Sequence, residues 1–204
     1  IHAAVAIEDK RFFEHQGVDW VTTIKACARM FMDNSGVGGS TITQQMIKNY
    51  TGKNEILVQR KVQEIISGIL VEKKYSKEEI LEKYMNIIYM GEGCFGVKSA
   101  AATYFGKELQ ELTLAECASL IGITNNPSLY DPYISDQTLA NNRERQLTIL
   151  DQMLDQGWID QDRYDEAVAQ EMVFKSGIAD EDRWVKCKTE GCGYQGPVRD
   201  LVHE

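Results

Sequence analysis

The sequence predicts a mainly α-helical protein with one domain over residues 1–175 and an irregular tail or linker at 176–204. Apolar residues recur at helical spacing almost throughout, and helix-start signals precede several of these stretches. No segment alternates apolar and polar residues as a half-buried strand would. Of the 204 residues 43% are hydrophobic and 26% charged, which is an ordinary globular balance that can bury one sizeable core.

The amino-terminal half contains three expected helices. The first covers about residues 19–32, with Asp19 as its candidate N-cap, and the turn-rich segment 33–39 ends it. The second begins at residue 40 or 41 and continues to about residue 50, and the third covers about 57–74. The apolar residues of the third are expected on its core side: Val62, Ile65, Ile66, Ile69 and Leu70.

One more helix in the amino-terminal half and three in the carboxyl-terminal half are also expected. SKEE at 76–79 has capping-box spacing and is expected to open a helix, as is TLAE at 113–116. The helix after TLAE should end before Pro127, and two others are expected over about 138–156 and 160–172. The helix after SKEE carries four residues at helical spacing: Ile80, Leu81, Tyr84 and Met85.

Charge and hydropathy exclude some classes of function. The net charge is −9, from 22 basic and 31 acidic residues, which disfavours a nucleic-acid partner. A few cations in one cleft could still bind an anionic substrate. No run of about 18 apolar residues could span a bilayer, and no signal peptide is present. The opening run IHAAVAIED resembles the middle of a helix, so we expect a piece of a longer protein.

The five cysteines do not form a disulfide framework. Cys27 and Cys117 lie in apolar helical stretches and are expected to be small buried hydrophobes. Cys187 and Cys192, with His203, could supply half of a zinc site, but the spacing is loose and a fourth ligand is missing.

The first segment whose side chains could take part in catalysis is EDKRFFEHQG, residues 8–17. Glu8 and Asp9 follow the apolar run AAVAI, so one of them should lie at the edge of the core, where partial desolvation favours proton abstraction. His15, about two helical turns beyond Glu8, could orient or pair with it. The alternative is a carboxylate pair that opens a helix.

The second segment is GGSTITQQMIKN, residues 38–49. Two glycines before a Ser/Thr-rich helix start resemble an anion cradle, in which free N–H groups, hydroxyls and the helix dipole point at a phosphate. Thr41, Gln45 and Lys48 share one helical face. The order of residues excludes a Walker loop, and the alternative is an ordinary N-cap with a solvated face.

Two further segments follow. In RKVQE, residues 60–64, Arg60, Lys61 and Glu64 share roughly one helical face, either as a surface salt bridge or as two cations for a pyrophosphate beside a second carboxylate. In residues 89–107 glycines alternate with aromatics before a small-residue helix, which indicates close backbone approach and tight packing.

In this order the segments closely resemble the peptidoglycan glycosyltransferases, the family-51 glycosyltransferases of class A penicillin-binding proteins and monofunctional transglycosylases. Segment 8–17 is similar to the first family motif and segment 38–49 to the second, with Met46 where Leu is usual. Segments 60–64 and 76–86 together resemble the third, 89–107 the fourth and 114–132 the fifth. The sequence departs from the family pattern at Asn125–Asn126 and at Arg145–Gln146.

The resemblance covers about residues 3–174 and implies a lysozyme-like fold, with a cleft between a large lobe and a small membrane-facing lobe. It implies that residues 1–175 are an amino-terminally truncated peptidoglycan glycosyltransferase domain that polymerises lipid II into β-1,4-linked glycan strands with inversion, releasing undecaprenyl pyrophosphate. The implied partners are lipid II, the growing glycan strand, the membrane surface and a carboxyl-terminal transpeptidase domain in the parent protein. The implied location is the extracytoplasmic face of the cell membrane.

The resemblance also implies roles for individual residues. Glu8 is expected to be the general base. Glu64 is expected to be the second catalytic carboxylate, which either orients cations or holds a divalent metal, Mg or Mn. Asp9 would either share that metal or orient Glu8. Lys48, Arg60 and Lys61 are the candidate cations for the departing pyrophosphate, with Ser40, Thr41 and Gln45 as neutral donors. The remaining expected substrate-binding residues are Phe12, His15, Gly39 and Asn49.

A membrane contact and two rival functions follow from the same residues. Met30, Phe31 and Met32 stand before a polar loop, so the helix over 20–32 is expected to touch the bilayer. One rival is a lysozyme-type hydrolase, which needs a protonated carboxyl group, and basic residues for pyrophosphate argue against it. The other is a non-catalytic module that binds lipid pyrophosphate, and the presence of Glu8 and Glu64 argues against that.

Overall fold

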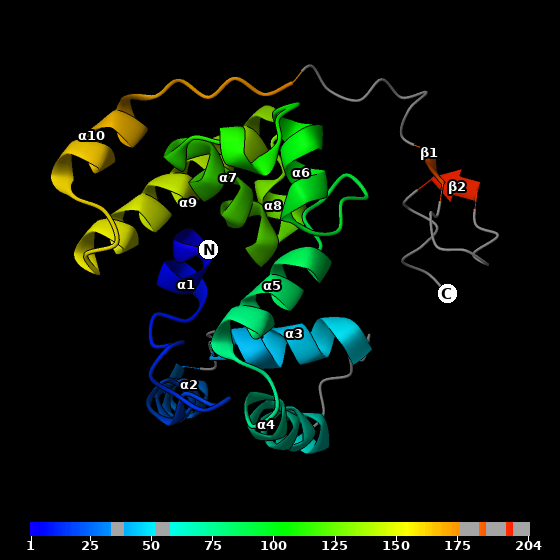
Figure 1. The fold of residues 1–204 in the computed structure, drawn as a ribbon, viewed down its shortest axis with the longest axis vertical. Coiled ribbons are helices and arrows are strands. Elements are labelled where there is room, and N and C mark those ends of the chain that lie inside the picture. Colours follow the sequence, from blue (N-terminus) through cyan, green and yellow to red (C-terminus); the bar gives the residue numbers. More distant parts are fainter. Residues whose placement is uncertain (34–38, 52–57, 176–183, 187–194, 198–204) are drawn as a thin grey trace. The chain divides into compact units, whose positions relative to one another are not determined.

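The mainly α-helical class is confirmed. The computed structural model describes the backbone of residues 1–33, 39–51, 58–175, 184–186 and 195–197, and the side chains of 1–26, 39–51 and 61–175. The described residues form ten α-helices, one 3-10 helix and two short strands (Figure 1), in the order α1 (His2–Glu8), α2 (Trp20–Asp33), α3 (Ile42–Thr51), α4 (Val58–Glu72), α5 (Lys77–Ile87), α6 (Val97–Tyr104), η1 (Leu109–Glu111), α7 (Leu114–Asn125), α8 (Pro127–Tyr130), α9 (Asp136–Asp155), α10 (Gln161–Ala169), β1 (Trp184–Lys186) and β2 (Gln195–Pro197).

The chain divides into two compact units. The first combines Ile1–Ile88 with Ile149–Tyr164, and the second combines Tyr89–Thr148 with Asp165–Glu204. In the first unit α3 packs against both α4 and α5, and Figure 1 shows α3 between them. The cleft expected between two lobes stays a prediction.

Helices α2 and α3 begin close to their predicted positions. Asp19 caps α2 as predicted, because its carboxylate accepts the backbone N–H of Thr22 at 3.1 Å. The same carboxylate also accepts hydrogen bonds from the Arg11 guanidinium, at 3.0 Å from Nε. Burial works to raise the pKa of Asp19, but the hydrogen bonds from Arg11 and Thr22 outweigh it and hold that pKa well below its ordinary value.

Helix α4 is present as predicted, but three of the five apolar residues expected on its core side are exposed, while Ile65 and Ile69 are partly buried. Val62, Ile66 and Leu70 are 49%, 53% and 59% exposed, whereas the buried line of the helix consists of Glu64 and Gly68. Gly68 approaches Gly17 so closely that a Cβ on Gly68 would lie 3.0 Å from the Gly17 carbonyl oxygen. The apolar period located the helix, and the polar residues that α4 contributes to the interior determined which face is buried.

Helices α5 and α7 confirm the two predicted capping boxes. Ser76 accepts the Glu79 backbone N–H and Glu79 accepts the Ser76 N–H in return, and Thr113 and Glu116 make the same pair of bonds. The four residues that the sequence places at helical spacing on α5 are all buried. Helix α7 ends at Asn125, directly before the residue that precedes Pro127.

In the second unit, the glycine-rich segment 89–107 forms a turn and then the predicted small-residue helix α6. Ala100 and Ala101 are completely buried. A Cβ at Gly91, whose φ is +79°, would lie 2.4 Å from Asp131 Oδ2 and 2.6 Å from the Tyr104 hydroxyl, so only glycine fits this turn.

Helix α10 ends at Ala169, three residues before the predicted end at 172. The following segment is extended because its residues contact other parts of the second unit. Phe174 stacks on Phe105 with ring centroids 5.1 Å apart, and the Lys175 N–H donates to the Tyr104 carbonyl at 2.8 Å. These contacts outweigh the helical periodicity of the local sequence.

The tail contains one structural feature that the sequence did not predict. Strands β1 and β2 pair antiparallel, and each has three residues, too few to produce a recognisable alternation in the sequence. Cys187, Cys192 and His203, and the side chains of Cys27, Met30, Phe31 and Met32, lie outside the described residues, while Cys117 is only partly buried. No helix in the described part of the chain is long and apolar enough to cross a membrane.

Candidate active site

Glu8 is the last residue of α1, and its carboxylate faces α3. Gln45, one turn into α3, donates from Nε2 to Glu8 Oε2 at 3.1 Å and accepts the hydroxyl of Tyr84 at 3.0 Å. Burial, and then the negative charges of Glu8 and Asp9, raise the pKa of Tyr84 well above its ordinary value, so Tyr84 remains a neutral donor. Glu8 is thus held by a chain of two neutral groups.

Ser40, Lys61 and Glu64 form the adjoining part of the site. Lys61 Nζ donates to Ser40 Oγ at 2.8 Å and to Gln44 Oε1 at 3.1 Å, and it lies 3.5 Å from Glu64 Oε2. Gln45 Nε2 also lies 3.4 Å from the Ser40 carbonyl. A carboxylate at the end of α1 and an ammonium group on α4 are therefore joined through the start of α3, all within the first unit.

The amino-terminal end of α3 is occupied by side chains of the protein itself. The Ile42 N–H donates to Asp9 Oδ2 at 3.0 Å, and the Gln44 N–H donates to Thr41 Oγ1 at 3.2 Å. The Thr41 hydroxyl donates to the Gly17 carbonyl at 2.8 Å. The expected anion cradle is therefore filled by the Asp9 carboxylate, and Thr41 serves as an N-cap rather than as a phosphate donor in this conformation.

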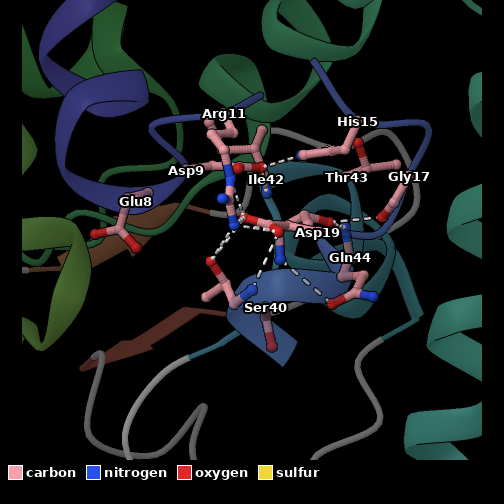
Figure 2. Close-up of polar contacts among 12 residues, drawn as sticks. Glu8, Asp9, Arg11, His15, Gly17, Asp19, Ser40, Ile42, Thr43 and Gln44 are labelled. Atoms are coloured by element: carbon pink, nitrogen blue, oxygen red, sulfur yellow. Dashed lines mark hydrogen bonds and ion pairs between the residues drawn. The ribbon is translucent and has the colours of Figure 1, made fainter. Parts of the chain in front are cut away.

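His15 and Phe12 lie in the interior. His15 pairs with Asp9 rather than with Glu8, because its Nε2 lies 2.9 Å from Asp9 Oδ2. α1 ends at Glu8 and the chain turns, so the predicted helical spacing between Glu8 and His15 does not exist. Figure 2 shows the Glu8 side chain pointing away from the contacts around Asp9 and His15. Phe12 has no exposed surface, so it packs in the core and does not contact a substrate in this conformation.

The other predicted binding residues are more dispersed. Lys48 lies exposed in the last turn of α3, and Asn49 is exposed beside it. Gly39 packs against α2, since a Cβ there would lie 2.7 Å from the Ala26 Cβ. Arg60 belongs to α4, but its side chain lies outside the described residues.

Three polar residues that organise this region stand outside the predicted site. The sequence places Tyr84 only on the helix after SKEE and predicts no role for Gln44 and Glu72. Glu72 continues the buried line of α4 at four-residue spacing after Glu64 and Gly68, and that repeat of polar or small residues was the available signal. Gln44 stands three residues after Thr41, at capping-box spacing, and its Oε1 accepts the Thr41 N–H at 3.3 Å, so that spacing was a second signal. Tyr84 carried none, because its partner Gln45 lies 39 residues away in the sequence.

The residues do not assemble a metal site by themselves. Across the described residues, no three His, Cys, Asp or Glu side chains gather closely enough to hold a metal ion. Asp9, expected to share a cation with Glu64, accepts hydrogen bonds from Ile42 and His15 instead. The observed donors thus do not fit a divalent cation held by protein ligands alone.

Comparison with known proteins decides the family. The family model described as Transglycosylase matches residues 1–154. The chain belongs to the transglycosylase family. Glu8, Ser40, Gln45, Lys61 and Glu64 all lie within the matched part, so the polar chain described above is a feature of the transglycosylase domain.

Individual relatives agree. A Cupriavidus necator protein named as a transglycosylase is 42% identical over 166 residues, which cover 81% of this chain and 71% of that protein. Penicillin-binding protein 1A of Pseudomonas aeruginosa is 41% identical over 169 residues, which cover 82% of this chain and 20% of that protein. Penicillin-binding protein 1F of Bacillus subtilis is 42% identical over 158 residues, which cover 77% of this chain and 22% of that protein. The chain spans about a fifth of these penicillin-binding proteins, and it is a peptidoglycan transglycosylase domain, an enzyme of cell-wall synthesis.

Proposed function

We propose that this domain polymerises lipid II into β-1,4-linked glycan strands with release of undecaprenyl pyrophosphate, and that Glu8 is the general base. One observation supports the proposal most strongly. Glu8 is linked through Gln45 and Ser40 to Lys61, so a proton acceptor and a cation stand at two ends of one hydrogen-bonded chain. Joining a sugar alcohol to a sugar pyrophosphate requires both groups at once.

Glu8 would accept the proton of the acceptor's 4-hydroxyl as the oxygen attacks the anomeric carbon of the growing chain. The bond from that carbon to the pyrophosphate oxygen breaks in the same step, and the electron pair leaves with the pyrophosphate. A single displacement inverts α to β without a covalent intermediate. Gln45 and Tyr84 would hold the carboxylate in place while leaving its charge available for the proton.

The leaving pyrophosphate carries negative charge that increases in the transition state, so cations must be ready to receive it. Lys61 has the clearest support, since Ser40, Gln44 and Glu64 direct its ammonium group. Lys48 and Arg60 are the further candidates. The role proposed for Glu64 is to orient Lys61. No step is assigned to a divalent cation, and a metal that bridges Glu64 and the pyrophosphate stays a prediction.

The proposed partners are the membrane surface, the growing strand and a transpeptidase domain in the parent protein. The proposed location of the domain is the extracytoplasmic face of the cell membrane. The names of the penicillin-binding relatives are consistent with such a parent. Exposed apolar residues on two helices of the first unit support contact with lipid: Trp20 and Ile24 on α2, and Val62, Ile66 and Leu70 on α4.

The test is Glu8→Gln, which removes the charge and nearly keeps the shape, assayed by gel separation of products from labelled lipid II. We expect the polymerisation rate to fall about a hundredfold or more, because that is the lower range for the loss of a general base. Glu14→Gln is the matched control, since Glu14 is an exposed carboxylate in the same segment. Near-native turnover by Glu8→Gln would remove Glu8 from this role.

The same assay separates the rival functions. Cleavage of polymeric glycan by the wild-type protein would indicate a hydrolase. Binding of lipid II without any product would indicate a non-catalytic module. Either result would overturn the proposal, whereas polymer formation that depends on Glu8 supports it.

A further inference from the structure

A buried chain of polar side chains begins at Asp9, the residue after Glu8. It consists of Asp9, His15 and Glu72, and we refer to it as the Asp9–His15–Glu72 chain. The three side chains are 3%, 8% and 4% exposed. Groups so deeply buried do not meet a sugar or a pyrophosphate, so their role must act through other residues.

Asp9 connects the end of α1 to the start of α3. It directly follows Glu8, and its own N–H bonds the Val5 carbonyl at 3.1 Å. Its Oδ2 accepts the Ile42 N–H, three residues before Gln45, the residue that donates to Glu8. The Asp9–Ile42 bond therefore fixes the distance between the carboxylate of Glu8 and the amide that orients it.

His15 fixes the rotamer of Asp9. Its Nε2 lies 2.9 Å from the same oxygen that accepts Ile42, and a carboxylate oxygen can only accept, so the proton is on Nε2. On its other side, Nδ1 lies 3.8 Å from Glu72 Oε1, which is a close polar contact longer than a hydrogen bond. The imidazole also packs edge-on against Phe12, with ring centroids 5.9 Å apart.

Glu72 is held in turn from two more helices. Thr43 of α3 donates to its Oε1 at 2.5 Å, and Lys77, the first residue of α5, donates to its Oε2 at 2.6 Å. Lys77 Nζ also lies 4.3 Å from the Phe12 ring centre. The end of α1 and the start of α3 are thus tied to the end of α4 and the start of α5. Figure 2 shows Asp9, His15, Ile42 and Thr43 gathered on one side, apart from Glu8.

We propose that Asp9, His15 and Glu72 are positioning residues that hold Glu8 in register with Gln45 and so set the rate of the chemical step without touching substrate. The inference rests on the proposed function of Glu8. A carboxylate displaced by about 1 Å from its reacting geometry costs up to about a hundredfold in rate. Residues that act in this way should change kcat and leave KM nearly unchanged.

The experiment compares His15→Asn with His15→Gln. A glutamine amide reaches about as far as imidazole Nε2, whereas an asparagine amide reaches only as far as Nδ1, so only glutamine can still donate to Asp9. His15→Asn is expected to lower kcat about ten- to a hundredfold at a nearly constant KM and to speed hydrogen exchange of the Ile42 amide. His15→Gln should restore both. His2→Gln is the control histidine, since His2 stacks on Trp158.

A folded His15→Asn variant with unchanged kcat and unchanged Ile42 exchange would overturn the proposal, and so would an effect on KM alone. Should His15→Asn not fold, NMR of the wild-type imidazole replaces it. A protected proton on His15 Nε2 supports the chain, and a proton on Nδ1 alone overturns it. If the wild-type protein made no polymer from lipid II, the proposed function would fail, whereas the exchange and NMR measurements would still decide on the chain.

Discussion

Helices α4 and α5 both pack against α3, yet they present opposite kinds of surface to it. α5 buries its apolar residues and exposes its charges, as an amphipathic helix of a soluble protein does. α4 exposes Val62, Ile66 and Leu70 and buries Glu64 and Gly68. Hydrophobic periodicity therefore located both helices but assigned the buried face correctly only for α5.

The difference follows from what each helix contributes to the first unit. α5 supplies core volume, the Tyr84 hydroxyl and, at its first residue, the Lys77 ammonium group that bonds Glu72. α4 supplies Glu64 and Lys61 to the active site and Glu72 to the buried chain, so its inner face is polar. Lys61 bonds Gln44 of α3 and Ser40 just before α3, and Glu72 accepts the Thr43 hydroxyl of α3. Val62, Ile66 and Leu70 face outward, where a lipid surface would accommodate them.

The contact that allows α4 to turn its polar face inward should be the most sensitive to substitution. A Cβ at Gly17, whose φ is +87°, would lie 2.4 Å from the backbone carbon of Gly68, so Gly17→Ala should cost several kcal/mol of stability. Gly157→Ala is the matched control, because its φ is +73° and a Cβ there meets nothing within 4 Å. Urea denaturation measures both, and equal losses would refute the steric explanation.

Core truncation should distinguish the two helices directly. Ile80 of α5 is completely buried, so Ile80→Ala should lower the free energy of unfolding by about 2–5 kcal/mol. Ile66 of α4 is half exposed, and Ile66→Ala should change the free energy of unfolding by about 0.5 kcal/mol or less. Thermal denaturation in the absence of lipid provides the measurement. Similar losses at the two positions would show that α4 buries its apolar face after all.

Helix α2 offers a third case, in which a charged residue rather than apolar packing fixes the helix start. The pKa of Asp19 is lower in the folded protein than in the unfolded chain. The carboxylate therefore contributes to the free energy of unfolding above about pH 4, and this contribution is lost as the pH falls toward the pKa of the folded state. Asp19→Asn should therefore lower the free energy of unfolding by about 1–3 kcal/mol at pH 7. The difference in the free energy of unfolding between wild type and variant should become smaller between pH 5 and about pH 3, as measured by denaturation followed by circular dichroism. A gap that is constant with pH would exclude this carboxylate as its source.

Sequence alone predicted those features whose determinants are local. The Ser76–Glu79 and Thr113–Glu116 capping boxes lie within four residues, and both form as expected. Glu8, Lys61 and Glu64 were found because they belong to motifs, although their contacts could not be derived. Asp9 meets Ile42 across 33 residues, and Tyr84 meets Gln45 across 39, and no local pattern encodes such a pairing.

The carboxylate of Asp9 at the start of α3 has a consequence for inhibitor design. It is tethered to the protein, so its effective concentration at these amides is millimolar or higher, and a phosphonate aimed at the helix terminus would have to compete with it. Among the residues that the structure describes, the ammonium group of Lys61 is held by the neutral oxygens of Ser40 and Gln44 and by Glu64 at 3.5 Å. An anionic drug fragment built toward Lys61 therefore has more to gain than one built toward the backbone.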